Sequence, residues 1–196
     1  SLVAKLPAHV LDALKGAERP MLVFGGGALS VPGVHGAGLA LAKSVNAVKD
    51  GWNGFNVLHI SAARMASLML GFTLPGGMGD IVQAAPKVLL SLGADEMDYA
   101  PYAGSLKVYI GHHGDKGAHH ADIILPGASF AEKDGTYVNA EGRVQFAEKA
   151  VYAPGDARED WSIFRALADT LGVSLGFDSF DACRAAMIGL TRGLCW

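Results

Sequence analysis

The sequence predicts an α/β fold of the doubly wound class: a mainly parallel sheet with helices on both faces, followed by a hairpin and C-terminal helices. Short apolar runs alternate with helical stretches over the first ~125 residues, which favours right-handed crossovers between parallel strands. The runs are almost continuously apolar, as in strands covered on both faces. Glycine occupies 26 of the 196 positions, well above the typical ~7%, which indicates many tight loops at element ends.

Five short strands are predicted in this first part, each ended by glycine, proline or polar residues. They are Met21–Phe24, Asn56–Ile60, Lys87–Leu92, Leu106–Ile110 and Asp122–Leu125.

Three connecting segments have clear patterns of their own. Residues Gly33–Lys49 carry apolar side chains at helical spacing. Ser61 can cap a helix that runs to about Leu70 and ends at Gly71. The segment Thr73–Asp80 is predicted to be a glycine loop.

The pattern changes after Pro126. Two short runs, Thr136–Asn139 and Arg143–Phe146, predict a hairpin. Asp156 is predicted to cap a helix that Gly172 ends, and a last helix is expected over Phe180–Leu190. We expect residues 1–196 to form a single domain, with the parallel sheet at about 20–126 and the hairpin and helices at about 127–196.

Composition excludes several classes of function. The net charge is −3 and no block of Lys or Arg is present, so no nucleic-acid partner is expected. No apolar run approaches the ~20 residues that span a bilayer, so no direct membrane insertion is expected. Only Cys183 and Cys195 are available, too few for a four-cysteine metal or iron–sulfur site. Cys183 lies on the apolar stripe of the last helix and is interpreted as a core residue. The chain begins at Ser1 without Met, so we interpret it as a piece of a longer protein.

Nucleotide-binding motifs are incomplete. Gly25, Gly26 and Gly27 follow the first strand, but Ser30 stands where the dinucleotide fingerprint needs its third glycine. Asp50, the nearest acidic candidate, is predicted at the end of a helix rather than a strand. The Walker pattern is also absent. We interpret these glycines as a strand–loop–helix corner.

A histidine-rich loop runs from Gly111 to Asp122. Imidazole and carboxylate groups could ligate a divalent metal ion, but neighbouring histidines tend to point apart, and the helical spacing of zinc sites is missing. We predict no metal site, and a solvated or interfacial loop that can titrate near neutral pH and tune a subunit contact. The side chains concerned are His112, His113, Asp115, His119, His120 and Asp122.

No catalytic residue is predicted. The nucleophile elbow G-x-S-x-G is absent, since Ala131 occupies its last position. Glu132 and Glu141 could act as an acid–base pair only if the fold brought them together. The simpler interpretation makes Glu132 and Lys133 a turn-stabilising surface pair, and places Glu141 in a turn.

Residues 107–171 nevertheless carry a specific pattern: ADIILPG, then EKDGT, then NAEGRVQ. This order resembles the molybdopterin oxidoreductase family. The GHHGD run before it and the DAREDWSIFRAL run after it are similar, more narrowly, to the large iron–sulfur subunits of respiratory complex I. Earlier runs such as RPMLVFGGGAL and PKVLLSLGADE agree, so the resemblance covers all but about the last twenty residues.

The resemblance implies a C-terminal, non-catalytic structural segment of the peripheral arm of NADH-quinone oxidoreductase. The parent complex would pass electrons from NADH through flavin and iron–sulfur clusters to quinone, coupled to proton translocation. The clusters would lie in an N-terminal half of the subunit, which would be a partner together with other peripheral-arm subunits. The expected location is the cytoplasmic side of a bacterial inner membrane or the matrix side of the mitochondrial one.

The resemblance also identifies vestigial positions of pterin-binding loops, although no cofactor is expected in this segment. Two alternatives stay open: a cofactor-binding part of a catalytic, formate dehydrogenase-like enzyme, and a free-standing nucleotide-binding domain. The vestigial candidates are Gly25, Gly26, Gly27, His112, His113, Asp115, Asn139 and Arg143.

Overall fold

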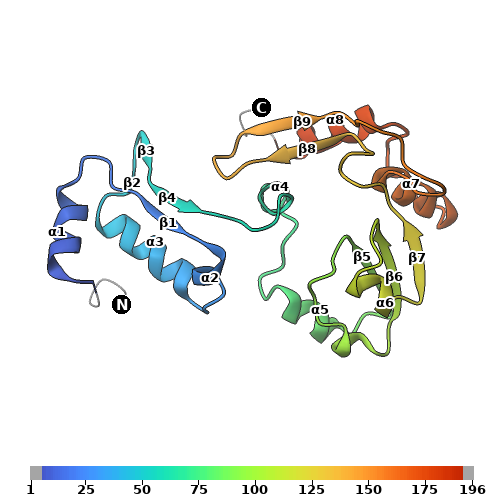
Figure 1. Ribbon diagram of the computed structural model, residues 1–196, viewed down its shortest axis with the longest axis horizontal. Coiled ribbons are helices and arrows are strands. Elements are labelled where there is room, and N and C mark those ends of the chain that lie inside the picture. Colours follow the sequence, from blue (N-terminus) through green and yellow to red (C-terminus); the bar gives the residue numbers. More distant parts are fainter. Residues whose placement is uncertain (1–5, 192–196) are drawn as a thin grey trace. The chain divides into compact units, whose positions relative to one another are not determined.

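The computed structural model describes residues 6–191, and Cys195 lies outside this range. The chain divides into two compact units (Figure 1). The first comprises residues up to Met65 together with Val138–Val144, and the second comprises Ala66–Tyr137 together with the chain from Gln145 onward. The assignment of residues 1–196 to one domain stays a prediction.

Among its described residues, the first unit holds three helices and four short strands. They are α1 (Ala8–Gly16), β1 (Leu22–Phe24), α2 (Gly26–Leu29), α3 (Val34–Ser44), β2 (Val48–Lys49), β3 (Trp52–Asn53) and β4 (Phe55–Val57). Strand β1 pairs in parallel with β4, Leu22 lying opposite Phe55. Strands β2 and β3 form a small antiparallel ribbon. The predicted strands at 21–24 and 56–60 are therefore present, each slightly shifted or shortened.

The core of the first unit lies along α3. The apolar spacing of this helix buries Leu41 and Ala42, and Val45 and Ala47 complete the cluster just beyond its end. Helix α1, which the sequence analysis did not predict, covers this cluster with Leu11 and Leu14. Burying such side chains contributes on the order of 1.5–3 kcal/mol each for the larger ones.

Helix α3 ends at Ser44, so the prediction that the helix continues to Lys49 is wrong. Asn46 adopts a positive φ of 56°, which no α-helix continues through. The Ala47 amide then donates to the Ala42 carbonyl at 2.8 Å. This reversal directs Val48–Lys49 into β2.

Two short helices follow, α4 (Arg64–Met69) and α5 (Met78–Ala84). Helix α4 lies within the range predicted after Ser61, but it begins only at Arg64, so Ser61 is not the residue before its first turn. Gly71 follows the helix with a φ of +71°. Helix α5 begins inside the segment predicted to be a glycine loop, so that prediction holds only up to Gly77. The carboxylate of Asp80 accepts the Gly76 amide at 2.8 Å and so fixes the start of α5.

The second unit is built on a three-stranded parallel sheet of β5 (Val88–Leu92), β6 (Leu106–Gly111) and β7 (Ile123–Pro126). Strand β6 is central, and its residues Val108, Tyr109 and Ile110 are buried. A 3-10 turn, η2 (Ala100–Tyr102), contributes Tyr102 to a cluster with Leu89 and Tyr99. Helix α6 (Lys116–His120) joins β6 to β7.

The hairpin and the C-terminal helices complete the chain: β8 (Gly135–Val138), β9 (Val144–Ala147), α7 (Asp160–Thr170) and α8 (Phe180–Leu190). Helix α8 matches its predicted range, and Ser179 caps it by accepting the Ala182 amide at 3.2 Å.

The predicted cap of α7 at Asp156 is wrong, because Glu159 is the residue before the first turn. The Arg158 amide donates to the Pro126 carbonyl at 3.0 Å, and the Arg158 carbonyl accepts the Ala128 amide at 2.8 Å. This bridge to the end of β7 keeps the chain extended until Glu159.

The predicted α/β class is confirmed: helices alternate with mostly parallel strands, and a hairpin and C-terminal helices follow. The parallel strands form two sheets, β1–β4 in the first unit and β5–β6–β7 in the second. Among residues 6–191, no helix combines the length and the apolar character needed to cross a bilayer.

Candidate functional site

The glycines after β1 form the corner that the sequence predicts. Gly25 precedes α2, a helix of only four residues, and has an ordinary negative φ of −87°. A side chain built on Gly25 or Gly27 would meet nothing within 4 Å, whereas one on Gly26 would lie 3.0 Å from Ile60 Cγ2. Ser30, at the position of the missing glycine, donates to the Gly27 carbonyl at 2.8 Å and so closes the turn.

The carboxylate of Asp95 anchors the histidine-rich loop of the second unit through two hydrogen bonds. One oxygen of this carboxylate accepts the Tyr109 hydroxyl at 2.9 Å, and the other accepts the Gly117 amide at 2.9 Å. A side chain on Gly111 or Gly117 would approach the Tyr109 ring to 2.4 and 2.5 Å, so both positions require glycine. Burial, and then the hydrogen bond and negative charge of Asp95, raise the pKa of Tyr109 well above its usual range.

The histidine side chains of this loop are exposed to solvent. His112 and His113 connect β6 to α6 with their rings 4.3 Å apart in an edge-to-face arrangement. Asp115 stands immediately before α6 and makes no side-chain hydrogen bond to its first turn. His120 stacks on Tyr99 at 5.1 Å.

That this loop holds no metal site stays a prediction. No three His, Cys, Asp or Glu side chains within the described range 6–191 lie in an arrangement that could hold a metal ion. The histidines of this loop are exposed, and their predicted role in a subunit contact stays a prediction.

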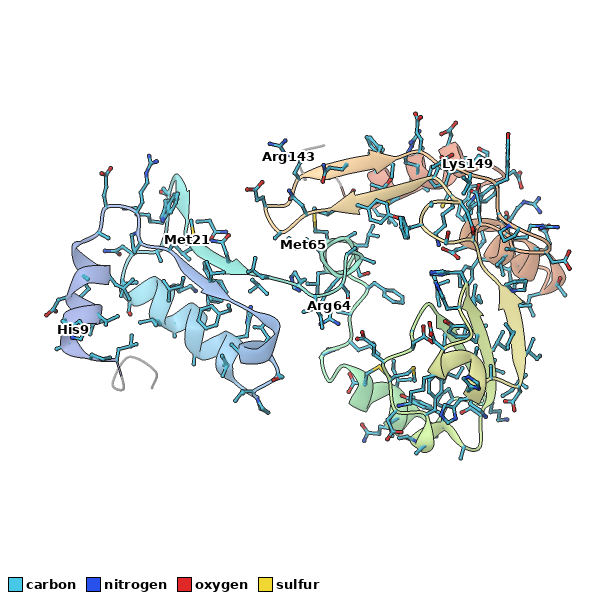
Figure 2. The ribbon with its side chains drawn as sticks, viewed as in Figure 1. His9, Met21, Arg64, Met65, Arg143 and Lys149 are labelled. Carbon is cyan, nitrogen blue, oxygen red and sulfur yellow. The ribbon has the colours of Figure 1, made fainter. Side chains whose placement is uncertain are left out.

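The hairpin tip explains the N-x-E-G-R run in structural terms. The side-chain carbonyl of Asn139 accepts the Glu141 amide at 3.0 Å and the Arg143 amide at 2.9 Å. The Asn139 amide donates to the Arg143 carbonyl at 3.1 Å, and Gly142 takes a φ of +84° that favours glycine. Asn139 and Arg143 are thus brought together by the turn itself, with Arg143 at the tip (Figure 2).

Glu132 stabilises a turn, as predicted, but Lys133 pairs with another residue. Glu132 accepts the Ser129 amide at 2.8 Å, and Lys133 pairs with Asp160 at the start of α7. Both side chains of that ion pair are largely covered. Glu141 takes part in the hairpin turn through its amide, as expected. Each acidic residue therefore has a local structural role.

Cys183, in α8, is part-buried, and burial raises the pKa of its thiol. A raised thiol pKa keeps the sulfur protonated near neutral pH, and the thiol is a poor nucleophile. Cys183 is only part-buried and α8 contains no fully buried residue, so its interpretation as a core residue stays a prediction.

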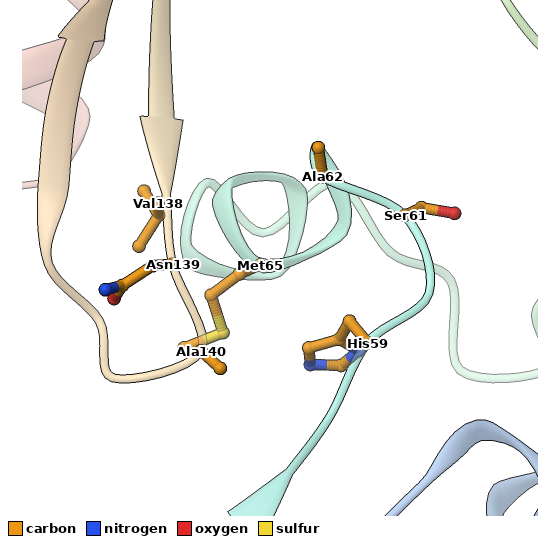
Figure 3. Close-up of a pocket in the computed structure, with 7 residues that line it drawn as sticks. All are labelled: His59, Ser61, Ala62, Met65, Val138, Asn139 and Ala140. Carbon is orange, nitrogen blue, oxygen red and sulfur yellow. The ribbon is translucent and has the colours of Figure 1, made fainter.

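One cleft was missed by the sequence analysis. It lies within the first unit, between the chain that follows β4 and the hairpin tip (Figure 3), and its volume is about 130 Å³. The imidazole of His59, the thioether of Met65 and the methyl of Ala140 face it, whereas the hydroxyl of Ser61 points away. The position of His59 just after a parallel strand was the available signal, since ligands gather at such strand ends. The lining residues are His59, Ser61, Ala62, Met65, Val138, Asn139 and Ala140.

The vestigial candidates are divided between the two units, and their role in pterin-binding loops stays a prediction. Gly25–Gly27 and the pair Asn139–Arg143 belong to the first unit, and His112, His113 and Asp115 belong to the second. Within each unit, the contacts of these residues close turns or fix loops.

Comparisons with known proteins give a consistent result. The model of the molybdopterin oxidoreductase family matches residues 1–170. The chain is 41% identical over 191 residues to the NADH-ubiquinone oxidoreductase 78 kDa subunit of Neurospora crassa, covering 92% of this chain and 25% of that protein. It is 42% identical over 179 residues to the NADH dehydrogenase [ubiquinone] iron-sulfur protein 1 of Solanum tuberosum, covering 89% and 24%. It is 37% identical over 178 residues to an NADH-quinone oxidoreductase subunit from Rickettsia felis, covering 89% and 26%. The chain thus spans about a quarter of the length of these relatives.

Proposed function

Because the chain belongs to the molybdopterin oxidoreductase family, we propose that it is a non-catalytic structural segment of the peripheral arm of NADH-quinone oxidoreductase, respiratory complex I. The observation that carries this proposal is the similarity of nearly the whole chain to large subunits named for that activity. None of the three relatives is named as a formate dehydrogenase or as a free-standing nucleotide-binding domain, so these alternatives gain no support.

We propose that this segment holds no pterin cofactor. The side-chain carbonyl of Asn139 is engaged by two amides of its own turn. The cleft beside it, at about 130 Å³, is smaller than the ~300 Å³ at which ligand sites of drug size begin. These observations support a fold that is kept for its shape and packing, and they agree with the broken nucleotide motifs.

Iron–sulfur clusters do not fit this segment either. Such a cluster is bound by several thiolates, usually four, and the sequence offers only Cys183 and Cys195. The relative from Solanum tuberosum is named an iron–sulfur protein. We place the clusters in an N-terminal part of the longer polypeptide, which becomes the first partner of this segment, together with other peripheral-arm subunits.

In the proposed assembly, the parent complex transfers electrons from NADH through flavin and iron–sulfur clusters to quinone and couples this transfer to proton translocation. The segment takes no chemical step of its own. Its location is the cytoplasmic face of a bacterial inner membrane, or the matrix face of the mitochondrial inner membrane.

An antibody raised against this segment tests the proposal on the native source. Solubilised membranes are separated on a native gel, and one lane is stained for NADH dehydrogenase activity. The expected result is comigration of the antibody signal with that activity, and a denatured band several times longer than 196 residues. A small band away from the activity would contradict the proposal.

A further inference from the structure

One dipeptide of the first unit can undergo a chemical modification. Asn53 and Gly54 form the only Asn-Gly pair of the sequence, and they lie at the end of β3 (Figure 1). In such a pair, the backbone nitrogen of the glycine can attack the side-chain carbonyl carbon of the asparagine, because glycine has no side chain to hinder the approach. The reaction is deamidation, and its only co-reactant is water.

The bonds change in two stages. A hydroxide ion of the solvent removes the proton of the Gly54 amide, and the nitrogen bonds to the carbonyl carbon of the Asn53 side chain. The C–N bond of the carboxamide breaks, and ammonia leaves with a proton taken from water. Water then opens the five-membered succinimide at either of its carbonyls, which gives aspartate or isoaspartate at position 53. No group is oxidised or reduced.

The fold holds both reacting groups in place. The Gly54 amide donates to the Ala47 carbonyl at 2.6 Å, and the Gly54 carbonyl accepts the Leu22 amide at 2.7 Å. The side-chain oxygen of Asn53 accepts the Phe55 amide at 3.2 Å. Asn53 is exposed, but Gly54 is buried. While these bonds are closed, the nitrogen cannot give its proton to the solvent or turn toward the side chain of Asn53.

The space around Gly54 is filled by its neighbours. A side chain at this position would run into the Pro20 carbonyl oxygen and would lie 2.7 Å from Nε1 of Trp52. The Trp52 indole donates to the same Pro20 oxygen at 2.9 Å, and the Arg19 guanidinium lies 5.6 Å from the centroid of its ring. The contact between Trp52 and Pro20 therefore keeps the end of β3 closed over Gly54.

We propose that Asn53 is a modification site that the fold keeps closed, and that it deamidates only when the contacts of Gly54 open. A chain that opens is then modified irreversibly, because the ammonia is lost to the solvent. Isoaspartate puts one additional carbon into the main chain, so Gly54 can no longer make both of its backbone bonds in the filled space. Aspartate leaves the main chain unchanged, and its carboxylate still accepts the Phe55 amide. This inference does not depend on the proposed function.

Peptide mapping by mass spectrometry measures the reaction. The full-length protein in its native assembly is incubated in a mildly alkaline buffer, and a second sample is incubated in the same buffer after unfolding in urea. Conversion of residue 53 should be at least roughly tenfold slower in the native sample, because the required opening costs free energy. Equal rates in the two samples, or no conversion in urea, would overturn the inference.

A matched pair of tryptophan variants tests whether the contacts around Gly54 set the rate. Trp52→Phe removes the N–H that binds Pro20, and Trp161→Phe removes an N–H that donates to Glu159 at 2.7 Å in the second unit. Trp52→Phe should speed the conversion of Asn53 in the native protein roughly three- to tenfold, because one hydrogen bond fewer holds the site closed. Trp161→Phe should leave this rate within about twofold of the parent protein. An unchanged rate in Trp52→Phe, or an equal rise in both variants, would show that these contacts do not protect Asn53.

Discussion

The hydroxyl of Tyr109 in β6 donates to the carboxylate of Asp95, 2.9 Å away, in the loop after β5. The second oxygen of Asp95 accepts the amide of Gly117 in α6, also at 2.9 Å. One carboxylate therefore joins a loop, a strand and a helix at the base of the histidine-rich loop. Hydrogen bonds to a charged acceptor are stronger than those between neutral groups, so this contact is a natural target for mutation.

Asp95→Asn should lower the free energy of unfolding by about 1–3 kcal/mol, because an amide has one acceptor oxygen where the carboxylate uses two, and it lacks the negative charge. Urea denaturation measures the change. Asp98→Asn is the matched control, since Asp98 accepts one amide, that of Ala100 at 3.0 Å, in an exposed turn. Its cost should stay within about 0.5 kcal/mol. Equal losses in the two variants would contradict a special role for Asp95.

The pKa of Tyr109 predicts a loss of stability at alkaline pH. Its folded-state pKa is raised above the unfolded value of about 10, so the folded protein holds this proton more tightly. The corresponding stability is fully present below pH ~10 and is lost as the pH rises above that value toward the folded pKa. Denaturation curves between neutral pH and pH ~11 should show this decline, and Tyr109→Phe should make it shallower. An identical decline in the two proteins would contradict the assignment.

Gly117→Ala should destabilise the second unit by about 1–3 kcal/mol, because the new methyl would lie 2.5 Å from a carbon of the Tyr109 ring and 2.6 Å from an oxygen of Asp95. Gly114→Ala, in the same loop, is the control, since a side chain there meets nothing within 4 Å. Thermal unfolding compares the two variants. A Gly114 variant as unstable as the Gly117 variant would mean that the loop backbone, and not the contact with Tyr109, sets the cost.

The ion pair of Lys133 and Asp160 should contribute more than a surface pair. The exposed fractions of its side chains are 23% and 28%, so solvent screens it less than the exposed pair of Arg184 and Asp181. A double-mutant cycle with Lys133→Met and Asp160→Asn should give a coupling energy of about 1–2 kcal/mol. The cycle on Arg184 and Asp181 should give less than about 0.5 kcal/mol. Similar values for both pairs would show that burial adds nothing.

Asn139→Ala should cost about 1–2 kcal/mol, because the amides of Glu141 and Arg143 would lose their acceptor. Asn139→Asp should restore most of this stability, since a carboxylate oxygen accepts the same two bonds. Chemical denaturation of the three proteins is the measurement. An Asp variant as unstable as the Ala variant would show that the amide group of Asn139 has another role.

The strands were predictable because their signals are local. β5, β6 and β7 match the predicted runs to within one residue at each end, since an apolar run bounded by glycine or proline has few alternatives. Helix α8 matches for the same reason, with a serine cap and an apolar stripe in adjacent sequence. The prediction failed where the start of a helix depends on contacts with residues that are distant in the sequence. Asp156 has the right chemistry for a cap, but the bridge from Arg158 to Pro126 delays α7.

The candidate residues were found from motifs, but their partners were not. Nothing in the sequence places Asp95 beneath Tyr109 or Asp160 beside Lys133, because each contact joins residues more than ten positions apart. The turn at Asn139 is the opposite case, since all of its hydrogen bonds fall within four residues. The cleft at His59 needs the hairpin tip to be brought against the chain after β4, which no local pattern encodes.

The contact at Asp95 also limits how this chain can diverge. The carboxylate, the phenol of Tyr109 and the bare backbone of Gly117 occupy the same few ångströms, so a change at one position alone leaves an orphaned group or a clash. Tolerated substitutions should therefore arise in concert. In an alignment of relatives, the positions of Asp95, Tyr109 and Gly117 should covary. The position of Gly114 should vary independently of them.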